Sequence, residues 1–277
     1  MDQNADEAVV RDFGQEWSAF PQDQLDPSEH DKIFQDYFHL FPFNQVSNGI
    51  GLDVGCGSGR WAALVAPKVR TLFALDASPE ALAVARSNCG HLANVEFLAH
   101  SVDSIPFGAN HFDFAYSLGV LHHVPRTQDA IKSIHKVLKP GAPFLIYLYY
   151  KLDNRPLPFR MIWLVSDLLR RWISVQCHWK KRLICDLLAI GIYYPLARFS
   201  RALEKLGLNV KGLPLSFYRD KSFYTMRTDS LDRFGTRLEQ RFSKQEIEKM
   251  LLDCGFTDVH FSDREPYWTA LCCKATT

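Results

Sequence analysis

A glycine-rich turn behind an apolar strand is the feature that most constrains the fold of this chain. The segment GLDVGCGSGR, residues 51–60, places Gly55, Gly57 and Gly59 directly after that strand. Turns of this kind join a strand to a helix in nucleotide-binding α/β folds, where a backbone without side chains approaches the ligand closely. The sequence therefore predicts a nucleotide-like ligand at the carboxyl end of the strand.

Strand and helix patterns alternate around this turn. Apolar strands are predicted at residues 49–54, 71–76, 95–98, 112–117 and 143–150, with helices at 58–66, 78–88 and 127–138. One more helix, capped by Ser243, and two more strands close the chain within residues 242–277. Such alternation favours parallel βαβ units, so we expect a Rossmann-like, doubly wound α/β sheet of seven strands.

The alternation stops where long amphipathic runs replace the strands. We therefore expect an N-terminal helical lid segment at 1–48, a ligand-binding core at 49–150, a mainly helical insertion at 151–241 and completion of the core at 242–277. The insertion holds 18 Lys and Arg against 8 Asp and Glu, whereas the whole chain has a net charge of +1. The insertion is thus basic, and the rest of the chain is acidic. The overall charge alone indicates no partner class.

The insertion raises the question of membrane contact. Its helix at 160–173 has an apolar face that we expect to pack against the core, the usual place for such a face, although a lipid surface would also accept it. Its longest uncharged run, 187–197, is far shorter than the ~20 residues of a membrane-spanning helix. The sequence thus allows peripheral membrane contact and predicts no span.

Cysteine usage bears on metal binding and on location. The seven cysteines form no C-x-x-C pair and no zinc-like spacing with histidine, so we expect free thiols and no metal site. The first ten residues, MDQNADEAVV, contain no apolar leader segment. Reduced thiols without a leader predict a cytoplasmic protein.

Two acids narrow the choice of ligand. Asp53 precedes the glycines, where a carboxylate is badly placed beside a pyrophosphate and well placed beside a cation. Asp76 ends the next strand, where an acid can accept hydrogen bonds from both hydroxyls of a ribose. A phosphate-free adenosine with a cationic amino-acid tail meets both conditions, and S-adenosylmethionine is such a ligand.

With these motifs the chain resembles the class I S-adenosylmethionine-dependent methyltransferases of the methyltransferase-11, ubiquinone-methylase-like type. The resemblance rests on LDVGCGSGR, LDAS, FDFAYSLGVLHHV and LKPGAPFLIYL, in that order, and covers residues 49–150 and the close at 242–277. It implies a mostly parallel sheet with an antiparallel last strand. It also implies S-adenosylmethionine as methyl donor and S-adenosylhomocysteine as product.

The donor site that the resemblance implies lies at the carboxyl ends of the first four strands and comprises Asp53, Gly55, Cys56, Gly57, Gly59, Asp76, Ala77, Ser101, Val102, Asp103, Ser117 and Leu118. The family pattern gives Asp53 the amino group of the donor and Asp76 the ribose. After the third strand the family usually carries an acid that binds adenine, and Ser101 stands there instead. We expect Ser101 and Val102 beside the adenine, with Asp103 as the alternative partner.

Residues after the fourth and fifth strands are candidates for the chemistry, namely His122, His123 and Tyr150. A base would assist a hydroxyl acceptor, but a structural turn for the histidines and core packing for the tyrosine stay open. Candidate acceptor contacts lie in the N-terminal segment and the insertion: Trp17, Asn154, Arg155, Tyr218, Arg219, Tyr224 and Arg227. Guanidinium groups suit an anionic acceptor, although a solvated basic surface would explain them equally.

These features predict methylation of an oxygen or nitrogen of a small molecule, which the arginines would favour as an anion. One alternative acceptor is amphiphilic and membrane-associated, such as a quinone or a lipid-linked glycan. RNA is a further alternative, but the sequence holds no recognised RNA-binding module. A non-catalytic module is opposed by the intact set of glycines and acids, and the oligomeric state stays open.

Overall fold

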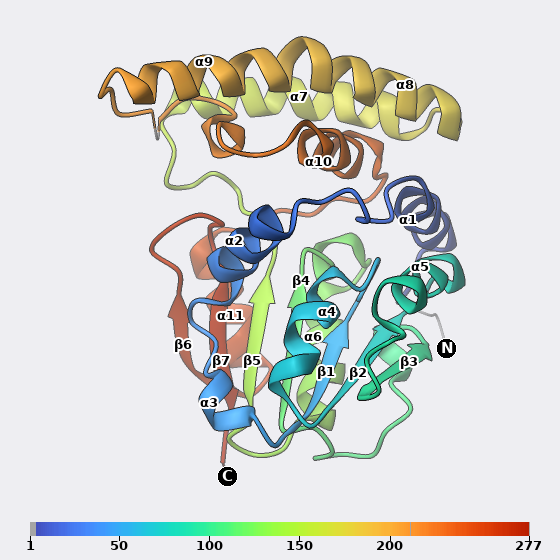
Figure 1. Ribbon diagram of the computed structural model, residues 1–277. Helices are drawn as coiled ribbons and strands as arrows, with labels where there is room; N and C mark the ends of the chain where they lie inside the picture. Colours follow the sequence, from blue (N-terminus) through green and yellow to red (C-terminus); the bar gives the residue numbers. More distant parts are fainter. Residues whose placement is uncertain (1–3, 211, 277) are drawn as a thin grey trace. The chain divides into compact units, whose positions relative to one another are not determined.

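The computed structural model describes residues 4–210 and 212–276, which form two compact units (Figure 1). The described part of the first unit is 4–22, 31–153 and 238–276. The second unit is 23–30 together with the described part of 154–237.

The first unit is built on one seven-stranded sheet. Its strands are β1 (Ile50–Val54), β2 (Thr71–Asp76), β3 (Val95–Ala99), β4 (Phe114–Leu118), β5 (Pro143–Tyr147), β6 (Phe256–Phe261) and β7 (Ala270–Lys274). They lie in the order β3-β2-β1-β4-β5-β7-β6, and β7 alone runs opposite to the other six strands. The predicted fold class, including the antiparallel last strand, is confirmed.

Helices cover both faces of this sheet (Figure 1). They are α1 (Glu7–Ala19), α2 (Pro27–Phe38, which begins in the second unit), α3 (Phe43–Val46), α4 (Arg60–Val65), α5 (Pro79–Cys89), α6 (Thr127–Val137) and α11 (Lys244–Asp253), with short 3-10 turns η1 (Ala66–Lys68), η2 (Val102–Ser104) and η3 (Leu121–His123). Helices α6 and α11 bury apolar residues in one core cluster, and α2 and α4 in the other. Local signals start the helices: Ser78 caps α5, and Ser243 forms a capping box with Glu246.

The second unit is helical. Its elements are α7 (Leu157–Ser174), α8 (His178–Leu188), the π-helical segment η4 (Ala189–Tyr193), α9 (Tyr194–Lys205), η5 (Ser216–Tyr218) and α10 (Phe223–Gly235). Segments α8, η4 and α9 form one continuous run of 28 residues. Helix α10 packs against both α7 and α8.

The expectation that the helix at 160–173 packs its apolar face inward was wrong. The buried residues of α7 are Arg170, Ile173 and Ser174, whereas its large apolar side chains, such as Val165 and Leu168, are exposed. The guanidinium of Arg170 points inward because it donates to the carbonyl oxygens of Thr236 and Arg237 (3.0 and 3.4 Å). That contact turns the apolar face outward.

In the part of the chain that the structure describes, one helical run has the length and hydropathy of a membrane-spanning helix, His178–Lys205, with a mean hydropathy of 1.3 in its most apolar window. Only 28% of that window is buried. Its apolar side chains therefore face outward, as they do in α7.

Candidate functional site

A buried carboxyl lies at the end of β1. Asp53 is 1% exposed and accepts a hydrogen bond of 2.9 Å from the hydroxyl of Tyr116 on β4. Burial raises the pKa of Asp53 to about 8, the hydrogen bond from Tyr116 opposes that rise, and the charge of Asp76 adds to it. A cation placed beside Asp53 would lower this pKa and favour the carboxylate.

A half-buried carboxyl lies at the end of the adjacent β2. Asp76 accepts hydrogen bonds from the backbone N–H groups of Gly57 and Ser78, both at 2.9 Å. Burial raises its pKa, and these backbone donors hold it down. Among the residues that the structure describes, neither Asp53 nor Asp76 has an ion-pair partner. Two such carboxyls on adjacent strands fit a ligand that carries positive charge and hydroxyl donors.

The glycine turn is closely packed between the two strands. The N–H groups of Gly55 and Cys56 both donate to the carbonyl oxygen of Leu75 (2.7 and 3.0 Å), which fixes the turn beside β2. At Gly57 (φ +54°) a Cβ atom would lie 2.8 Å from the indole ring of Trp17, so only glycine lets helix α1 approach the turn so closely.

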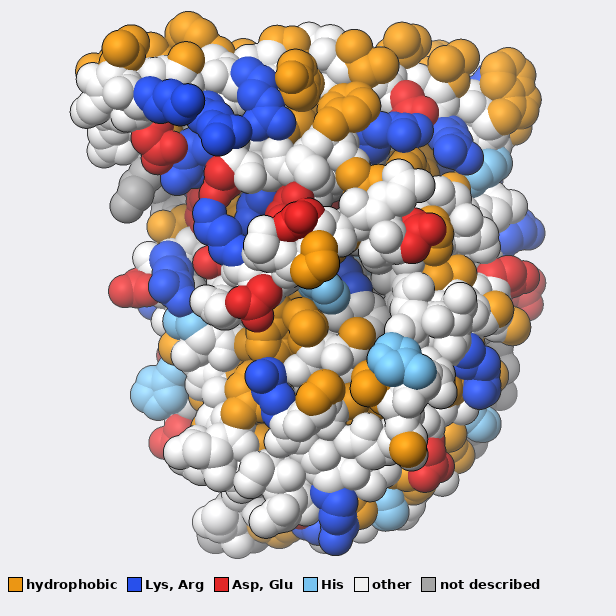
Figure 2. Space-filling view, in the orientation of Figure 1, with side chains coloured by type: hydrophobic (Ala, Val, Ile, Leu, Met, Phe, Trp, Pro, Cys, Tyr) orange, Lys and Arg blue, Asp and Glu red, His pale blue; other side chains and the backbone are white. Residues whose placement is uncertain are grey.

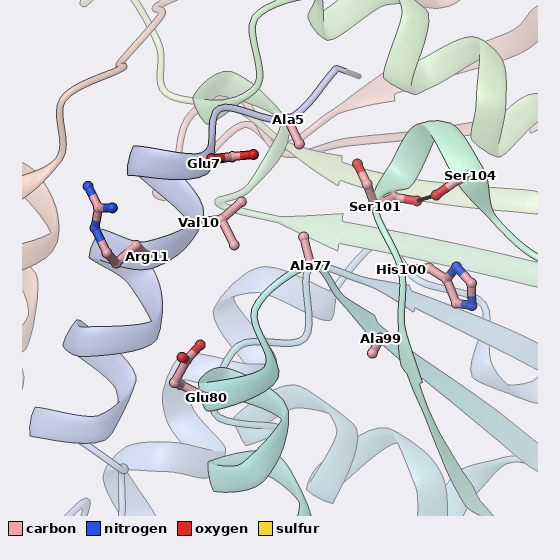
Figure 3. A pocket seen from close by; sticks show the side chains of 10 residues that line it. All are labelled: Ala5, Glu7, Val10, Arg11, Ala77, Glu80, Ala99, His100, Ser101 and Ser104. Atoms are coloured by element: carbon pink, nitrogen blue, oxygen red, sulfur yellow. Dashed lines mark hydrogen bonds between the residues drawn. The ribbon is translucent and has the colours of Figure 1, made fainter. Parts of the chain in front are cut away.

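A pocket of about 540 Å³ opens at the ends of β2 and β3 (Figure 3). Its lining comes from α1 and the residues before it, from the ends of β2 and β3, and from the starts of α5 and the turn η2: Ala5, Glu7, Val10, Arg11, Ala77, Glu80, Ala99, His100, Ser101 and Ser104. Figure 3 shows Ala77 and Ser101 facing the space that α1 closes on the other side. Its volume is within the usual range for small-molecule sites, and the predicted residues Ala77 and Ser101 lie in its wall.

The end of β3 is tied to the N-terminal segment. Asp103 accepts a hydrogen bond from the backbone N–H of Asn4 (2.8 Å). The side chain of Asn4 bonds the backbone of Arg126 twice, as donor to its oxygen (2.8 Å) and as acceptor from its nitrogen (2.7 Å). Val102 is buried. Asp103 therefore holds the segment that leads into α1, a contact that competes with the alternative role of binding adenine.

The histidine pair lies in η3 and is buried. His122 stacks on Tyr149 with ring centroids 3.9 Å apart, and neither of its ring nitrogens has a hydrogen-bond partner among the described residues. Burial, with the charges of His123 and Arg241, holds the pKa of His122 well below its usual value. His123 contacts the carbonyl oxygen of Leu238 through Nδ1 (2.6 Å), and its ring lies 4.9 Å from that of Phe13 in α1. Thus the imidazole of His122 is buried with a lowered pKa, whereas His123 is held by the backbone.

Other predicted residues of the first unit lie on or beside the same strand ends. The hydroxyl of Ser117 donates to the carbonyl oxygen of Val54 (3.0 Å), which links β4 to β1. Cys56 and Leu118 are buried. At Gly59 (φ +77°) a Cβ atom would lie 2.6 Å from Sγ of Cys89. Tyr150 forms a parallel bridge with Phe242 rather than belonging to β5.

Residues of the insertion that were candidates for acceptor contacts make contacts within the second unit. Arg227 forms a two-pronged ion pair with Asp186 (2.8 and 2.9 Å), and Arg219 pairs with Glu204 (2.9 Å). Burial and the neighbouring Asp229 raise the pKa of Tyr218 well above its ordinary value. Elsewhere in the unit, the guanidinium of Arg155 lies over the ring of Phe159, the carbonyl oxygen of Tyr224 accepts from Thr228, and Asn154 is exposed.

Sequence reasoning missed Tyr116 and Asn4. Each acts on a partner far away in the chain: Tyr116 on Asp53, and Asn4 on Asp103 and Arg126. The alternating pattern of FDFAYS signals a strand but not that a tyrosine hydroxyl meets a carboxyl 63 positions earlier. Among the described residues, no group of three or more His, Cys, Asp or Glu is placed to hold a metal ion.

Comparison with known proteins gives the family of this arrangement. Residues 52–146 match the model of a methyltransferase domain, methyltransferase-11. An uncharacterised methyltransferase of Synechocystis is 32% identical over 125 residues, 43% of this chain and 58% of that protein. The ubiquinone/menaquinone biosynthesis C-methyltransferase of Pseudomonas fluorescens is 34% identical over 110 residues, 37% of this chain and 43% of that protein. The matched segment thus spans about half the length of these relatives.

Solved structures agree on the fold. A protein from Haloferax volcanii, solved with the methyltransferase activator Trm112, superposes with a TM-score of 0.52 at 14% identity, covering 95% of this chain and 97% of that one. An S-adenosylmethionine-dependent methyltransferase of Methanosarcina mazei gives a TM-score of 0.50 at 18% identity, covering 87% and 97%. Together with the strand order, these findings identify residues 52–146 as a methyltransferase domain of the methyltransferase-11 type, in a chain with the fold of S-adenosylmethionine-dependent methyltransferases.

Proposed function

We propose that the protein transfers a methyl group from S-adenosylmethionine to an oxygen or nitrogen of a small organic molecule. One observation carries the donor side of this proposal: the buried carboxyl of Asp53 and the half-buried carboxyl of Asp76 stand beside a glycine turn, with a pocket at the ends of β2 and β3. When bound, S-adenosylmethionine supplies an electrophilic methyl group on a sulfonium.

The chain's own residues bind and shield that donor. Asp76 would accept from the ribose and Asp53 would neutralise the amino group, while Ala77, Ser101 and Val102 would enclose the adenine. Helix α1, held over the turn at Gly57, would keep water from the reacting atoms. Binding and alignment of this kind supply much of the rate in a displacement that needs few other groups.

His122 is the residue that we propose as proton acceptor. It is buried, stacked on Tyr149, and without a hydrogen-bond partner among the described residues. Its lowered pKa keeps it neutral at neutral pH, and a neutral imidazole can take the proton that an acceptor hydroxyl or ammonium loses. We assign His123 and Tyr150 positioning roles, since each is held by the backbone near this site.

Two measurements test this function. Calorimetry should show donor binding that Asp76→Ala weakens at least about 10-fold, the loss expected for charge-assisted hydrogen bonds, whereas Asp263→Asn, on an exposed loop, leaves it unchanged. A panel of metabolites assayed for release of S-adenosylhomocysteine should then identify the acceptor. Donor binding that is absent in the unaltered protein would refute the proposal.

The role of His122 has its own test. His122→Ala should slow turnover by about 10²–10⁴-fold, as the loss of a general base does, with donor affinity retained. His91→Ala, at an exposed position of the first unit, is the matched control. Full activity in the His122 variant would assign the residue to packing.

A second candidate acceptor is an amphiphile such as a quinone. Two observations favour it: the relative from Pseudomonas fluorescens acts in ubiquinone and menaquinone biosynthesis, and large apolar side chains are exposed along α7, α8 and α9. Including a short-chain quinol in the metabolite panel distinguishes the two acceptors. We propose neither RNA nor another nucleic acid as a partner, and the seven free cysteines fit a reducing, cytoplasmic location.

A further inference from the structure

The helices of the second unit have their apolar faces on the outside. In α7 the exposed residues include Leu157, Met161, Ile162, Leu164, Val165, Leu168, Leu169 and Trp172. Several are more exposed than buried; Leu168, for example, is 67% exposed. A surface helix of a globular protein normally turns such residues inward, and a contiguous exposed apolar patch of this extent marks an interaction site.

The run from α8 to α9 repeats this arrangement over 28 residues. Its inward stripe consists of small or polar residues at nearly every fourth position: Lys181, Cys185, Ala189, Tyr193, Ala197 and Ser200. Its outward face carries Trp179, Leu183, Leu187, Ile190, Tyr194, Leu196 and Phe199, all exposed. Figure 2 shows hydrophobic side chains gathered along the outer edge of the region of α8 and α9, next to Lys and Arg side chains.

The inner side of these helices is too polar for a bilayer to surround them. Asp186 on α8 pairs with Arg227 on α10, and Arg170 on α7 pairs with Asp167. Helix α10 and the carbonyl groups that bind Arg170 would have to enter the hydrocarbon if the helices crossed it, at a high free-energy cost. An outer apolar face on a polar base is the arrangement of helices that lie in the plane of a membrane interface.

Charge identifies the occupant of this face. Residues 154–237 hold 16 Lys and Arg against 6 Asp and Glu, a net charge of +10. Lys180, Arg201 and Lys205 on the α8–α9 run are exposed. Residues 23–30 add three acids, so a second copy of the whole unit would bring +7 against +7. Anionic lipid headgroups instead offer both the opposite charge and an apolar interior. Trp172 and Trp179 are of the residue type that prefers the headgroup level.

From these observations we propose that α7 and the α8–α9 run form a docking surface that lies in the interface of an anionic lipid bilayer, with their apolar faces among the acyl chains. The occupant is the lipid surface. This inference rests on the second unit alone and does not depend on the proposed methyl transfer.

Sedimentation with vesicles tests it in the absence of methyl donor and acceptor. The intact protein should pellet with vesicles of phosphatidylcholine and phosphatidylglycerol and much less with phosphatidylcholine alone. The triple variant Leu168→Ser, Trp179→Ser, Leu187→Ser should partition at least about 10-fold more weakly, because each residue takes apolar area into the membrane. A second triple variant, Lys180→Gln, Arg201→Gln, Lys205→Gln, should bind anionic vesicles about 100-fold more weakly. Each basic residue near the surface contributes about fivefold to vesicle binding.

The controls lie in the first unit. Leu252→Ser removes an apolar side chain from α11 that is also more than half exposed, and Lys136→Gln removes an exposed charge from α6. Both should leave vesicle binding unchanged, and all variants should keep the melting temperature and donor affinity of the unaltered protein. An intact protein that stays in the supernatant at millimolar anionic lipid would overturn the proposal. So would an apolar triple variant that changes a dimer to a monomer without changing vesicle binding, since a second copy would then be the occupant.

Discussion

Gly55 shows how a single residue limits what the turn can carry. It has φ +76°, and a Cβ atom there would lie 2.4 Å from Cγ1 of Val120. Gly119 has nearly the same φ, +78°, with nothing within 4 Å of a Cβ atom. Both positions impose the cost of a left-handed backbone on alanine, about 1–2 kcal/mol, but only Gly55 adds a collision.

We predict that Gly55→Ala lowers the free energy of unfolding by about 1–3 kcal/mol more than Gly119→Ala does, the usual range for overpacking a closed site. Urea unfolding of the two variants, without donor, measures the difference. Equal losses would mean that Val120 moves aside and that backbone strain alone selects glycine in the turn.

Asp53 makes stability depend on pH. Its pKa of about 8 in the folded protein lies above the ordinary value of 3.8, so the folded state keeps a proton that the unfolded chain releases. The stability that the protonated Asp53 contributes to the folded state is therefore complete below about pH 4 and is lost as the pH rises through about 8. We predict that the free energy of unfolding of Asp53→Asn changes less with pH between these two values than that of the unaltered protein.

Denaturant unfolding at a series of pH values measures this profile. Asp263→Asn, at an exposed position, should reproduce the slope of the unaltered protein. An Asp53→Asn profile as steep as that of the unaltered protein would assign the decline to another group.

For single residues, the sequence predicts which side chains belong to the site better than it predicts which other residues they contact. The positions of Asp53 and Asp76 follow from the strand pattern and the spacing of the glycines. The sequence does not predict that Tyr116 donates to Asp53, or that Asn4 bonds the backbone of Arg126, which lies 122 positions later. Such pairs depend on how strands and loops meet in space.

Among the elements, helix α1 is held in place by hydrogen bonds of Asn4, which lies just before the helix begins. Asn4 bonds Asp103 and Arg126, and Trp17 at the other end of the helix lies against Gly57. The three hydrogen bonds of Asn4 hold the segment that leads into a helix lining the pocket. These bonds therefore hold one wall of the pocket in place.

We predict that Asn4→Ala speeds amide hydrogen exchange in α1 by about 10–100-fold. Without the side-chain hydrogen bonds of Asn4, the free energy required to open this segment falls by about 1–3 kcal/mol. Donor affinity should fall with it. Asn44→Ala, at an exposed position, serves as control, and unchanged exchange in the Asn4 variant would show that the contacts of Trp17 hold α1 by themselves.

Elements with strong local signals were predictable and those that depend on their surroundings were not. Strand β2 was predicted at its observed bounds, and the caps Ser78 and Ser243 were found where the sequence indicates them. For α7 the helix was correct but its orientation was not. Periodicity shows that a helix has two faces; which face turns inward was decided by the hydrogen bonds of Arg170 to a segment more than 60 positions later.

At the scale of the whole molecule, the chain leaves the first unit after Asp153 and re-enters it at Leu238. The segments on either side of this excursion are paired: Lys151 donates to the carbonyl oxygen of Phe242, and Asp153 accepts from Trp268. The first unit therefore holds both ends of the insertion by its own contacts.

We predict that replacing residues 154–237 by a short Gly/Ser linker leaves a folded protein that still binds the methyl donor but no longer binds anionic vesicles. Circular dichroism, calorimetry and vesicle sedimentation measure the three properties. A shortened chain that aggregates or fails to bind the donor would show that the insertion is needed for the core. Domain bounds of this kind are visible in the sequence as a change of pattern, but whether a part folds alone depends on its contacts.

The π-helical segment η4 (Ala189–Tyr193) has a geometric consequence for the long helix. A stripe at every fourth residue turns about 40° per step around an ordinary α-helix, and about 160° over the four steps from Lys181 to Ala197. The wider π turn takes back part of this rotation where the stripe crosses Ala189 and Tyr193. One residue lost from η4 would rotate α9 by about 100° against α8. The segment therefore keeps the outer face straight instead of letting it wind round the helix as a spiral.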